Sequence, residues 1–282
     1  LFHRRLRSVD HLTEFEEAAE VTPRRLRYFN AGFLKQRRVR RIMELAGHDL
    51  RLGKPAEGDG VAVWGHSPYA GRGEAVSDAT GAPLVRVEDA FLRSVHPGRD
   101  GEPPLGLIID PVGMHFASEH PSKLERLLRE HPLDDTALLN RARAGIARLR
   151  EARLSKYNDF DPDLEAPAPG YVLVIDQTRG DASVTQGRAD LNSFKEMLYW
   201  AQEDNPAARI VIKTHPETMA GHREGYLSAE DATSDRVTLL TDPVDPWSLL
   251  EGATGVYCVS SQMGFEAILM GHRPVVFGQP FY

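Results

Sequence analysis

Residues 171–187 read YVLVIDQTRGDASVTQG, an apolar, β-branched run that leads into a polar loop containing glycine. The run predicts a buried strand, and the next segment, DLNSFKEMLYWAQED at 190–204, predicts a helix. The alternation then continues to the end of the chain, with strands expected at 208–215, 236–241, 255–261 and 273–278 and helices at 245–253 and 262–271. Alternating strands and helices indicate a mainly parallel sheet with helices on its faces.

An earlier part of the chain has the same pattern. Strands are expected at 60–65, 83–89 and 105–110, and helices at 71–81, 120–131 and 136–157. Between the two parts lies NDFDPDLEAPAPG (158–170), which is acidic, rich in proline and without periodicity, as is typical of a linker. We therefore predict an α/β protein with two Rossmann-like domains, at residues 59–165 and 166–282.

Residues 1–58 are predicted to form a mostly helical N-terminal segment. The first 60 residues contain 13 Lys and Arg against 9 Asp and Glu, concentrated in RRLR (at 4–7 and 24–27) and KQRRVRR (35–41). At helical spacing the arginines share one face, and the other face carries Leu34, Val39, Ile42, Met43 and Ala46. The basic face is either simply solvated or a contact with an anionic membrane surface or a polyanionic acceptor.

Composition narrows the function classes. The 282 residues carry a formal net charge of −7, which disfavours a nucleic-acid binder. The single cysteine, Cys258, excludes an internal disulfide, fits a reducing compartment and so favours the cytoplasm; we expect it in a buried strand. No run is long and apolar enough to span a membrane, and no signal peptide is visible, although the chain begins with Leu1 and not Met.

The C-terminal ends of parallel strands, where ligands bind in such sheets, precede three polar loops in the second domain. In the last of these, Ser260 and Ser261 stand at the start of a helix, where free N–H groups and the helix dipole attract an anion. Gly264 would allow close approach of a ligand or backbone, and Glu266 can accept two hydroxyls, as from a ribose. The alternative is a serine helix cap followed by an exposed glutamate.

The other two loops also carry polar groups. Lys213 and His215, before the helix-stopping Pro216, can both meet a phosphate. The loop after the strand at 171–176 holds four polar side chains: Asp176, Gln177, Asp181 and Ser183. A carboxylate there can act as nucleophile or base in transfer at a sugar's anomeric carbon, although turn formation explains the same residues.

In the first domain, Glu88 and Asp89 end a strand and are followed by Arg93. Adjacent acids facing the second domain can handle an acceptor hydroxyl, or they can be salt-bridged loop residues. The histidines have no spacing typical of a metal site, so no metal is expected. No GxGxxG or Walker A motif follows any expected strand.

Seven segments taken together resemble the bacterial capsule polysaccharide β-Kdo transferase family. In order along residues 61–282 they are VWGHSP, RVEDAFLRSV, PPLGLIID, LSKYN, VLVIDQTRGDASVTQG, IVIKTHPE and SSQMGFEAILMGHRPVVFGQPFY. Each segment is weak alone, but the ordered set is specific. Ala90 stands where the family has a glycine, and residues 1–60 match less clearly.

The resemblance implies a GT-B architecture, with two Rossmann-like domains facing a cleft, and CMP-Kdo as the donor substrate without a further cofactor. It implies transfer of Kdo, with retention through a carboxylate nucleophile, to a glycolipid acceptor that carries Kdo at the inner membrane. The nucleophile is expected to be Asp181, with Asp176 as the competing carboxylate. Glu88, Asp89 and Arg93 would lie near the reaction centre. The donor pocket would contain Gln177, Ser183, Lys213, His215, Pro216, Ser260, Ser261, Gly264 and Glu266.

Two alternatives remain open from the sequence. The chain can be another GT-B enzyme that uses a different nucleotide sugar, including a sugar-nucleotide epimerase, because GFEAILMGHRPVV occurs loosely across that fold. It can also be a non-catalytic carbohydrate-binding module. Members of the family continue beyond the segment that matches GQPFY, so we expect the second domain to be incomplete at Tyr282. For the donor's carboxylate, the expected cationic partners are Lys213, Arg93 and Arg179.

Overall fold

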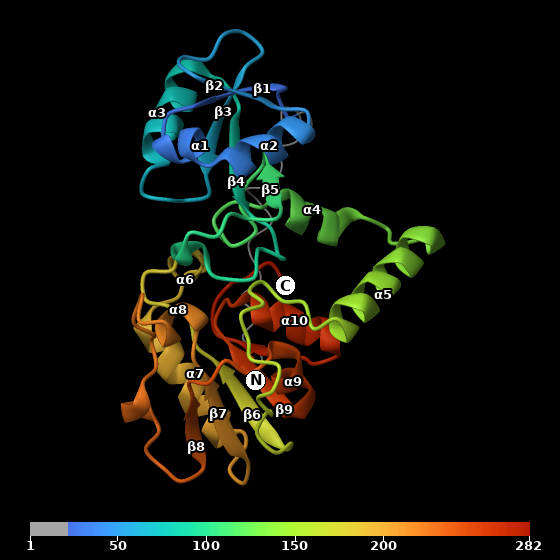
Figure 1. Cartoon of the computed structure of the whole chain (residues 1–282), viewed down its shortest axis with the longest axis vertical. Helices are drawn as coiled ribbons and strands as arrows, with labels where there is room; N and C mark the ends of the chain where they lie inside the picture. The colour runs from blue at the N-terminus through green and yellow to red at the C-terminus, as the bar shows by residue number, and fades with distance from the viewer. Residues whose placement is uncertain (1–21) are drawn as a thin grey trace.

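The computed structural model describes residues 22–282 and has two lobes, one above the other in Figure 1. Each lobe is built on a five-stranded sheet with helices against it. The first sheet contains β1 (Arg25–Tyr28), β2 (Asp49–Leu52), β3 (Gly60–Trp64), β4 (Leu84–Asp89) and β5 (Leu107–Asp110). The second sheet contains β6 (Tyr171–Ile175), β7 (Arg209–Lys213), β8 (Val237–Leu240), β9 (Ala253–Cys258) and β10 (Val275–Val276). The predicted α/β class is confirmed.

The second sheet is parallel throughout, in the order β10-β9-β6-β7-β8. This is the doubly wound order, in which the strand sequence reverses between β6 and β9, and ligands bind beyond the carboxyl ends of those two strands. β6 is buried along its whole length because helices cover both faces of the sheet. Its helices are α6 (Ala182–Gln186), α7 (Leu191–Glu203), α8 (Pro216–Met219), α9 (Pro246–Gly252) and α10 (Gln262–Met270).

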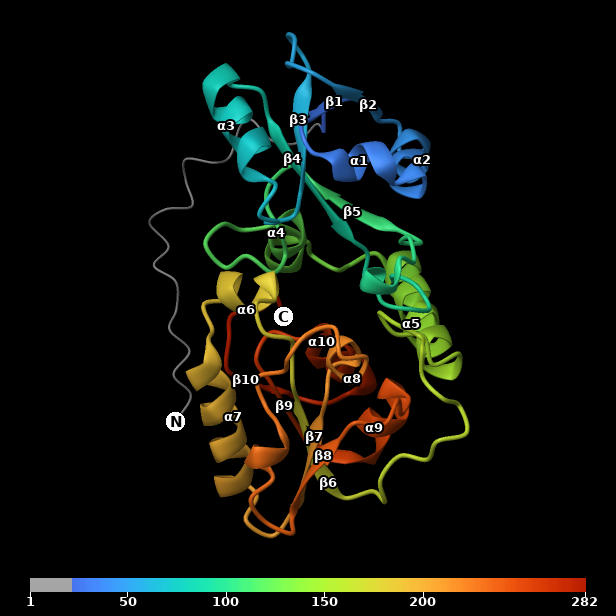
Figure 2. The same cartoon turned by 60° about the vertical axis from the view of Figure 1, so that its left-hand side comes forward.

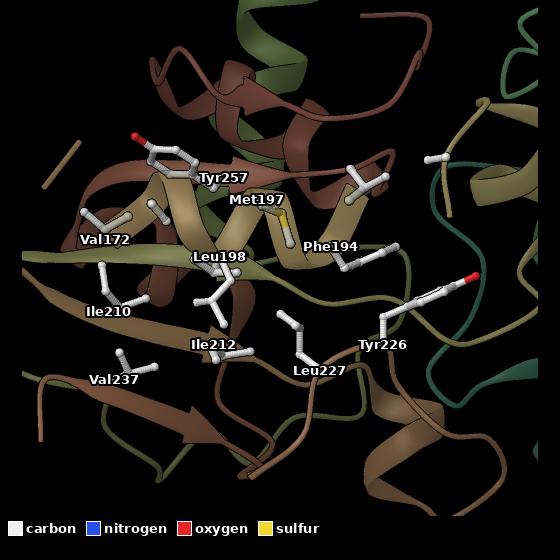
Figure 3. Close-up of a cluster of buried hydrophobic side chains, with 14 of the residues drawn as sticks. Val172, Phe194, Met197, Leu198, Ile210, Ile212, Tyr226, Leu227, Val237 and Tyr257 are labelled. Atoms are coloured by element: carbon white, nitrogen blue, oxygen red, sulfur yellow. The ribbon is translucent and has the colours of Figure 1, made fainter. Parts of the chain in front are cut away.

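Helix α7 covers one face of the second sheet through an apolar stripe at helical spacing. Figure 3 shows Phe194, Met197 and Leu198 of this helix over side chains of the sheet. Phe194 also stacks on Tyr226, with ring centroids 4.0 Å apart. On the other face, α9 and α10 close a second apolar cluster, which includes Cys258. Cys258 is a fully buried strand residue, as predicted, and burial raises the pKa of its thiol to about 12.

The first sheet has the order β2-β1-β3-β4-β5 and is parallel except for β5, which runs antiparallel to β4. Its helices are α1 (Ala31–Lys35), α2 (Arg37–Leu45) and α3 (Gly71–Thr80). Buried Val39 and Met43 of α2 lie on the face predicted to be apolar, whereas Leu34 is 54% exposed and Ala46 is also exposed.

The prediction of a mostly helical segment at 1–58 is not confirmed for its described part, which contains β1 and β2 as well as α1 and α2. β1 pairs in parallel with β2 and also with β3. In β1 an alternating pattern buries Leu26 and Tyr28. Arg25 and Arg27 reach the buried carboxylate of Asp59, at 3.0 and 2.8 Å. These arginines therefore belong to an ion-pair cluster, and not to a solvated helix face. The RRLR at 4–7 lies outside the described residues.

The connection between the lobes contains α4 (Lys123–Glu130) and α5 (Thr136–Glu151). Helix α5 has no buried residue and projects from the body of the molecule (Figure 1). The helix predicted over 136–157 ends at Glu151, and residues 158–170 form no helix or strand, as expected of a linker. Among the helices of residues 22–282, none has the length and apolar character needed to cross a membrane.

Candidate active site

A cavity of about 260 Å³ lies between the lobes, and residues of both lobes line it. The first lobe contributes the end of β4 and aromatic residues of the loops after β4 and β5. The second lobe contributes the loops after β6, β7 and β9, which meet at the reversal point of the sheet; Figure 2 shows the helices that follow these loops facing the first lobe. Of the residues predicted from the sequence, the lining includes Glu88, Asp89, Gln177, Asp181, Ser183, Lys213, His215, Pro216, Ser260, Ser261 and Glu266.

Glu88 and Asp89 end β4 and bring two acids to the cavity. Burial raises the pKa of Glu88 to about 7, and the nearby Asp89 adds to this effect, while a hydrogen bond from the Asp89 backbone N–H opposes it. The side chain of Glu88 packs against Gly65. A Cβ at residue 65 would lie only 2.3 Å from Glu88 Oε2, so the packing requires a glycine there. A carboxyl group with a pKa near neutrality can donate or accept a proton at physiological pH.

Arg93 does not line the cavity. Its Nε donates to Asp89 Oδ2 at 2.6 Å, and its Nη1 donates to Ser94 Oγ and to the carbonyl of Glu102. Arg93 is buried behind Asp89, so it orients that carboxylate and does not face a ligand. The prediction that Arg93 acts at the reaction centre is corrected to a positioning role, because Asp89 occupies the guanidinium.

Asp181 begins α6 as its N-cap, with Oδ1 accepting a hydrogen bond from the N–H of Ser183 at 2.9 Å. One carboxylate oxygen is therefore fixed, which orients the group, and the side chain is only half-buried at the cavity wall. Its charge acts on Glu88 from the opposite lobe. The cavity thus brings together carboxylates from two lobes.

Asp176, the competing carboxylate, is engaged elsewhere. Its Oδ1 accepts hydrogen bonds from the backbone N–H groups of Tyr226 and Leu227, at 3.2 and 3.3 Å. The backbone of Gly225 packs against the other oxygen, Oδ2. A Cβ at residue 225 would lie 2.2 Å from Asp176 Oδ2. Burial raises the pKa of Asp176 to about 7. Asp176 therefore holds the 225–227 loop, although it also touches the cavity.

Gln177 ties together the loops after β6 and β9. Its Nε2 donates to the hydroxyls of Ser183 and Ser260, at 3.1 and 3.2 Å, and its Oε1 accepts from the Ser260 N–H at 3.0 Å. Both ends of the amide are used, so these side chains shape the cavity wall at the reversal point of the sheet. Sequence reasoning placed them in the site but could not see that they bond one another.

Lys213 and His215 form the wall after β7. The ammonium of Lys213 is buried, donates to the carbonyl of Thr214 at 3.0 Å, and has no carboxylate partner within 4.0 Å in residues 22–282. Burial lowers its pKa to about 8 and that of His215 to about 4. His215 Nδ1 accepts from the N–H of Glu217, so the neutral ring carries its proton on Nε2 as a donor. This wall presents donors suited to an anion.

The start of α10 differs from the prediction in two ways. Gly264 is not open to a ligand: an added Cβ would lie 2.3 Å from the Tyr282 hydroxyl and 2.6 Å from Cys258 Sγ. The glycine is needed for the packing of the Tyr282 ring, whose hydroxyl donates to the carbonyl of Ser261. Ser261 is the N-cap of α10 and accepts from the Met263 N–H, as the alternative expected.

Glu266 is buried, not exposed, and its carboxylate has protein partners. The hydroxyl of Ser155 donates to its two oxygens at 2.8 and 3.0 Å, and Gln262 donates more weakly at 3.4 Å. Burial raises the pKa of Glu266 to about 7. Glu266 therefore anchors the 155–158 segment to α10, and any contact with a ligand would be shared with Ser155.

Sequence reasoning gave no role to several residues of the cavity. Lys156 and Tyr157 come from the LSKYN segment, which was expected to be the end of a helix. A turn forms there instead, because Asn158 Oδ1 accepts from the N–H of Ser155 and its Nδ2 donates to the carbonyl of Ser94. Four more unassigned residues make an aromatic wall: Phe91, His115, Phe116 and Phe281. No spacing rule could have found it, since its members come from three distant loops.

Within the described part of the chain, no group of three or more His, Cys, Asp or Glu side chains is arranged to hold a metal ion. The donors that line the cavity include two lysines, a neutral histidine and several serine hydroxyls.

Comparisons with protein families and with known proteins both indicate a bacterial surface-polysaccharide protein. Residues 59–162 and 147–282 match the family described as "Capsule polysaccharide biosynthesis protein". The capsule polysaccharide modification protein LipA of Neisseria meningitidis serogroup B is 36% identical over 270 residues, which are 92% of this chain and 38% of LipA. The lipopolysaccharide-processing protein LpsZ of Rhizobium meliloti is 37% identical over 205 residues, 71% of this chain and 46% of LpsZ. The chain thus spans less than half the length of these curated relatives.

A solved structure also resembles the whole molecule. The chain titled "Thermosulfurimonas dismutans KpsC, beta Kdo 2,4 transferase" superposes with a TM-score of 0.83 at 35% sequence identity. The match covers 93% of this chain and 82% of that one, so both lobes are included.

Proposed function

Because the chain belongs to the capsule polysaccharide biosynthesis protein family, we propose that it is a retaining glycosyltransferase that moves Kdo from CMP-Kdo onto a glycolipid acceptor carrying Kdo. The observation that carries the proposal is the meeting of Asp181 with Glu88 and Asp89 in one cavity between the lobes. The similarity to the KpsC β-Kdo transferase over both lobes supports the choice of reaction and a GT-B arrangement.

In the first half of the proposed reaction, an Asp181 carboxylate oxygen forms a bond to the anomeric carbon C2 of Kdo. The bond from C2 to the phosphate oxygen of CMP breaks, and CMP leaves with the electron pair. The donors of Lys213 and His215 and the start of α10 would stabilise the charge on the departing phosphate.

In the second half, an acceptor hydroxyl attacks C2 and the ester bond to Asp181 breaks, which frees the carboxylate. The hydroxyl proton passes to Glu88 in its ionised form, with Asp89 beside it. Two successive displacements at the same carbon give overall retention. The buried partners of Asp176 disfavour it as the nucleophile, because its Oδ1 accepts two backbone hydrogen bonds.

The acceptor is proposed to be reached from a membrane surface. Helix α2 exposes Arg37, Arg38 and Arg41 to solvent, and a basic helix face is attracted to anionic lipid. Sedimentation with anionic vesicles tests this proposal. Wild type should bind the vesicles, and a variant in which these three arginines are glutamines should bind them less.

The central test is incubation with CMP-Kdo, followed by intact-mass measurement and peptide mapping. We expect a single Kdo adduct on the peptide that contains Asp181. Asp181→Ala should abolish adduct and transfer while CMP binding persists, since the phosphate wall is untouched.

Asp190→Ala is the matched control. Asp190 is likewise an aspartate N-cap in the second lobe, at the start of α7, and it does not line the cavity. Each substitution removes a cap worth about 1 kcal/mol, so only the Asp181 variant should lose the reaction. Full transfer by Asp181→Ala would refute the assignment.

A further inference from the structure

We propose that Lys156 binds the carboxylate that a 2-keto sugar acid carries on its anomeric carbon, and that it thereby selects this class of donor. The inference rests on the proposed function, because it takes a nucleotide-activated sugar acid to be the occupant of the cavity. The sequence suggested Lys213, Arg93 and Arg179 as partners of this carboxylate; the inference assigns that role to Lys156 instead.

The cationic side chains that line the cavity are Lys156 and Lys213, within residues 22–282. Arg93 is bound to Asp89 behind the wall. Arg179 lies outside the lining; it is exposed, donates to the carbonyl of Gly225, and lies 3.8 Å from the carboxylate of Glu224. Two of the three cations expected to meet the donor's carboxylate are therefore committed elsewhere.

The ammonium group of Lys156 has no committed acceptor. It makes no ion pair within 4.0 Å and no hydrogen bond to a side chain or carbonyl of the described residues. It lies over the ring of Tyr157, 5.5 Å from Nζ to the centroid. All three ammonium hydrogens are thus available to a ligand in the cavity.

The backbone of Lys156 is held by both lobes, so the position of its side chain is well defined. Its carbonyl accepts hydrogen bonds from the N–H groups of Arg93 and Ser94, at 3.1 and 3.3 Å, in the first lobe. Its backbone N–H donates to Glu266 in the second lobe. The preceding residue, Ser155, bonds the same carboxylate.

Negative groups surround the ammonium without touching it. Burial by itself lowers the pKa of Lys156, but these groups outweigh burial and raise the pKa above its usual value. The acids among them are, in order of effect, Asp181, Asp89 and Glu88; Tyr157 also raises the pKa of Lys156, but burial raises the pKa of Tyr157 itself, so its hydroxyl is neutral at pH 7. The lysine is therefore a permanent cation at neutral pH, placed among the three carboxylates that the reaction uses.

This placement matches the chemistry of a 2-keto sugar acid. Its carboxylate is attached directly to the carbon that Asp181 attacks, so it must enter a region that already holds three acids. Like charges repel strongly where water is excluded, and a cation at this point removes the repulsion. Lys213 lies on the wall after β7, where its ammonium donates to the carbonyl of Thr214, and it forms no ion pair with any of these three acids.

The test compares three ligands by calorimetry: CMP, a non-hydrolysable CMP-Kdo analogue, and the same analogue with hydroxymethyl in place of the carboxylate. Wild type should prefer the carboxylate form by about 10- to 100-fold, as expected for a charge-assisted hydrogen bond. In Lys156→Met that ratio should fall to near one while CMP affinity stays within about twofold. Lys156→Arg should restore part of the preference.

Two further variants complete the design. Lys213→Met should weaken all three ligands alike and keep the preference, because it acts on the phosphate. Lys54→Met, at an exposed lysine outside the cavity, should behave as wild type. If Lys156→Met binds CMP but still prefers the carboxylate form, the inference is overturned and the proposed function stands. If folded wild type binds neither CMP nor the analogues, the proposed function itself fails.

Discussion

Glu88 and Asp181 are both carboxylates of the same cavity, but the protein gives them different surroundings. Glu88 is buried beside Gly65, and its pKa rises to about 7, whereas Asp181 is half-buried and oriented by the N–H of Ser183. Two acids in contrasting environments are the usual basis for dividing nucleophile and acid–base roles in sugar transfer. The division proposed above follows from these surroundings and not from residue type.

Glu88→Gln tests the surroundings of Glu88 without a substrate. The pKa of Glu88 in the folded protein, about 7, lies above its usual 4.5, so the protonated form stabilises the fold. That stabilisation is complete below about pH 4.5 and is lost as the pH rises through 7. Glutamine stays neutral, so the variant should gain up to about 3 kcal/mol relative to wild type between pH 5 and pH 8. Urea denaturation at both pH values measures this, and an equal difference at the two would contradict it.

Sequence alone located the polar loops that line the cavity but misjudged what several of their residues touch. The prediction for Arg93 failed because the partner of a guanidinium is decided by the fold of the loop, which turns Arg93 toward Asp89. Gly264 was recognised as a position of close approach, but the approaching group is the ring of Tyr282. Lys156 was missed because a helix pattern continued through it, and the Asn158 hydrogen bonds that end the pattern have no strong sequence signature.

At the scale of elements, the turn at 155–158 is hydrogen-bonded to both lobes and lines the cavity between them. Ser155 binds Glu266 of α10, and Asn158 binds the carbonyl of Ser94 after β4. The segment between these two anchors carries Lys156 and Tyr157 into the cavity. Its geometry therefore depends on a few polar bonds more than on apolar packing.

Ser155→Ala should destabilise the protein by about 1–3 kcal/mol, since it removes the strongest partner of a buried carboxylate. A double-mutant cycle with Glu266→Ala isolates the bond. Ser155→Ala should have little effect in the Glu266→Ala background, because the group it serves is gone. Equal effects in both backgrounds, measured by urea denaturation, would show that Ser155 acts in some other way.

The elements themselves were largely predictable. In the second lobe, apolar β-branched runs mark the strands and amphipathic runs mark α7 and α10, because both faces of a parallel sheet must be buried. β1 was not predicted, because its solvent-facing arginines suggest a helix until the buried carboxylate of Asp59 is seen beside them. Helices α6 and α8 have only five and four residues, which is too few to show the apolar periodicity of a helix.

At the scale of the whole molecule, two partly exposed polar contacts connect the lobes on one side of the cavity. Arg99 of the first lobe lies 3.1 Å from the carboxylate of Glu217 in α8, and Asp100 lies 2.6 Å from His222. Partly exposed pairs of this kind contribute little to folding stability. Their effect is on how the lobes are held relative to each other. The family resemblance drawn from seven ordered segments is also confirmed at the scale of the whole molecule, because the family match and the structural match both cover both lobes.

Arg99→Ala combined with Asp100→Ala should therefore change the unfolding free energy by less than about 1 kcal/mol, yet increase the radius of gyration measured by X-ray scattering. The matched control is Arg41→Ala with Glu44→Ala, which removes an exposed pair within the first lobe and should leave the radius unchanged. A loss of several kcal/mol without expansion would mean that these pairs support folding and not lobe position.

One contact of the connecting segment has a practical consequence. Trp247 of α9 is buried, and its indole N–H donates to the carbonyl of Leu154, two residues before Lys156. The other two tryptophans, Trp64 and Trp200, lie elsewhere in the fold. With both replaced by phenylalanine, all remaining indole fluorescence would come from Trp247. Its emission wavelength then reports, in solution and in real time, whether the backbone that carries Lys156 stays docked while a ligand enters and leaves.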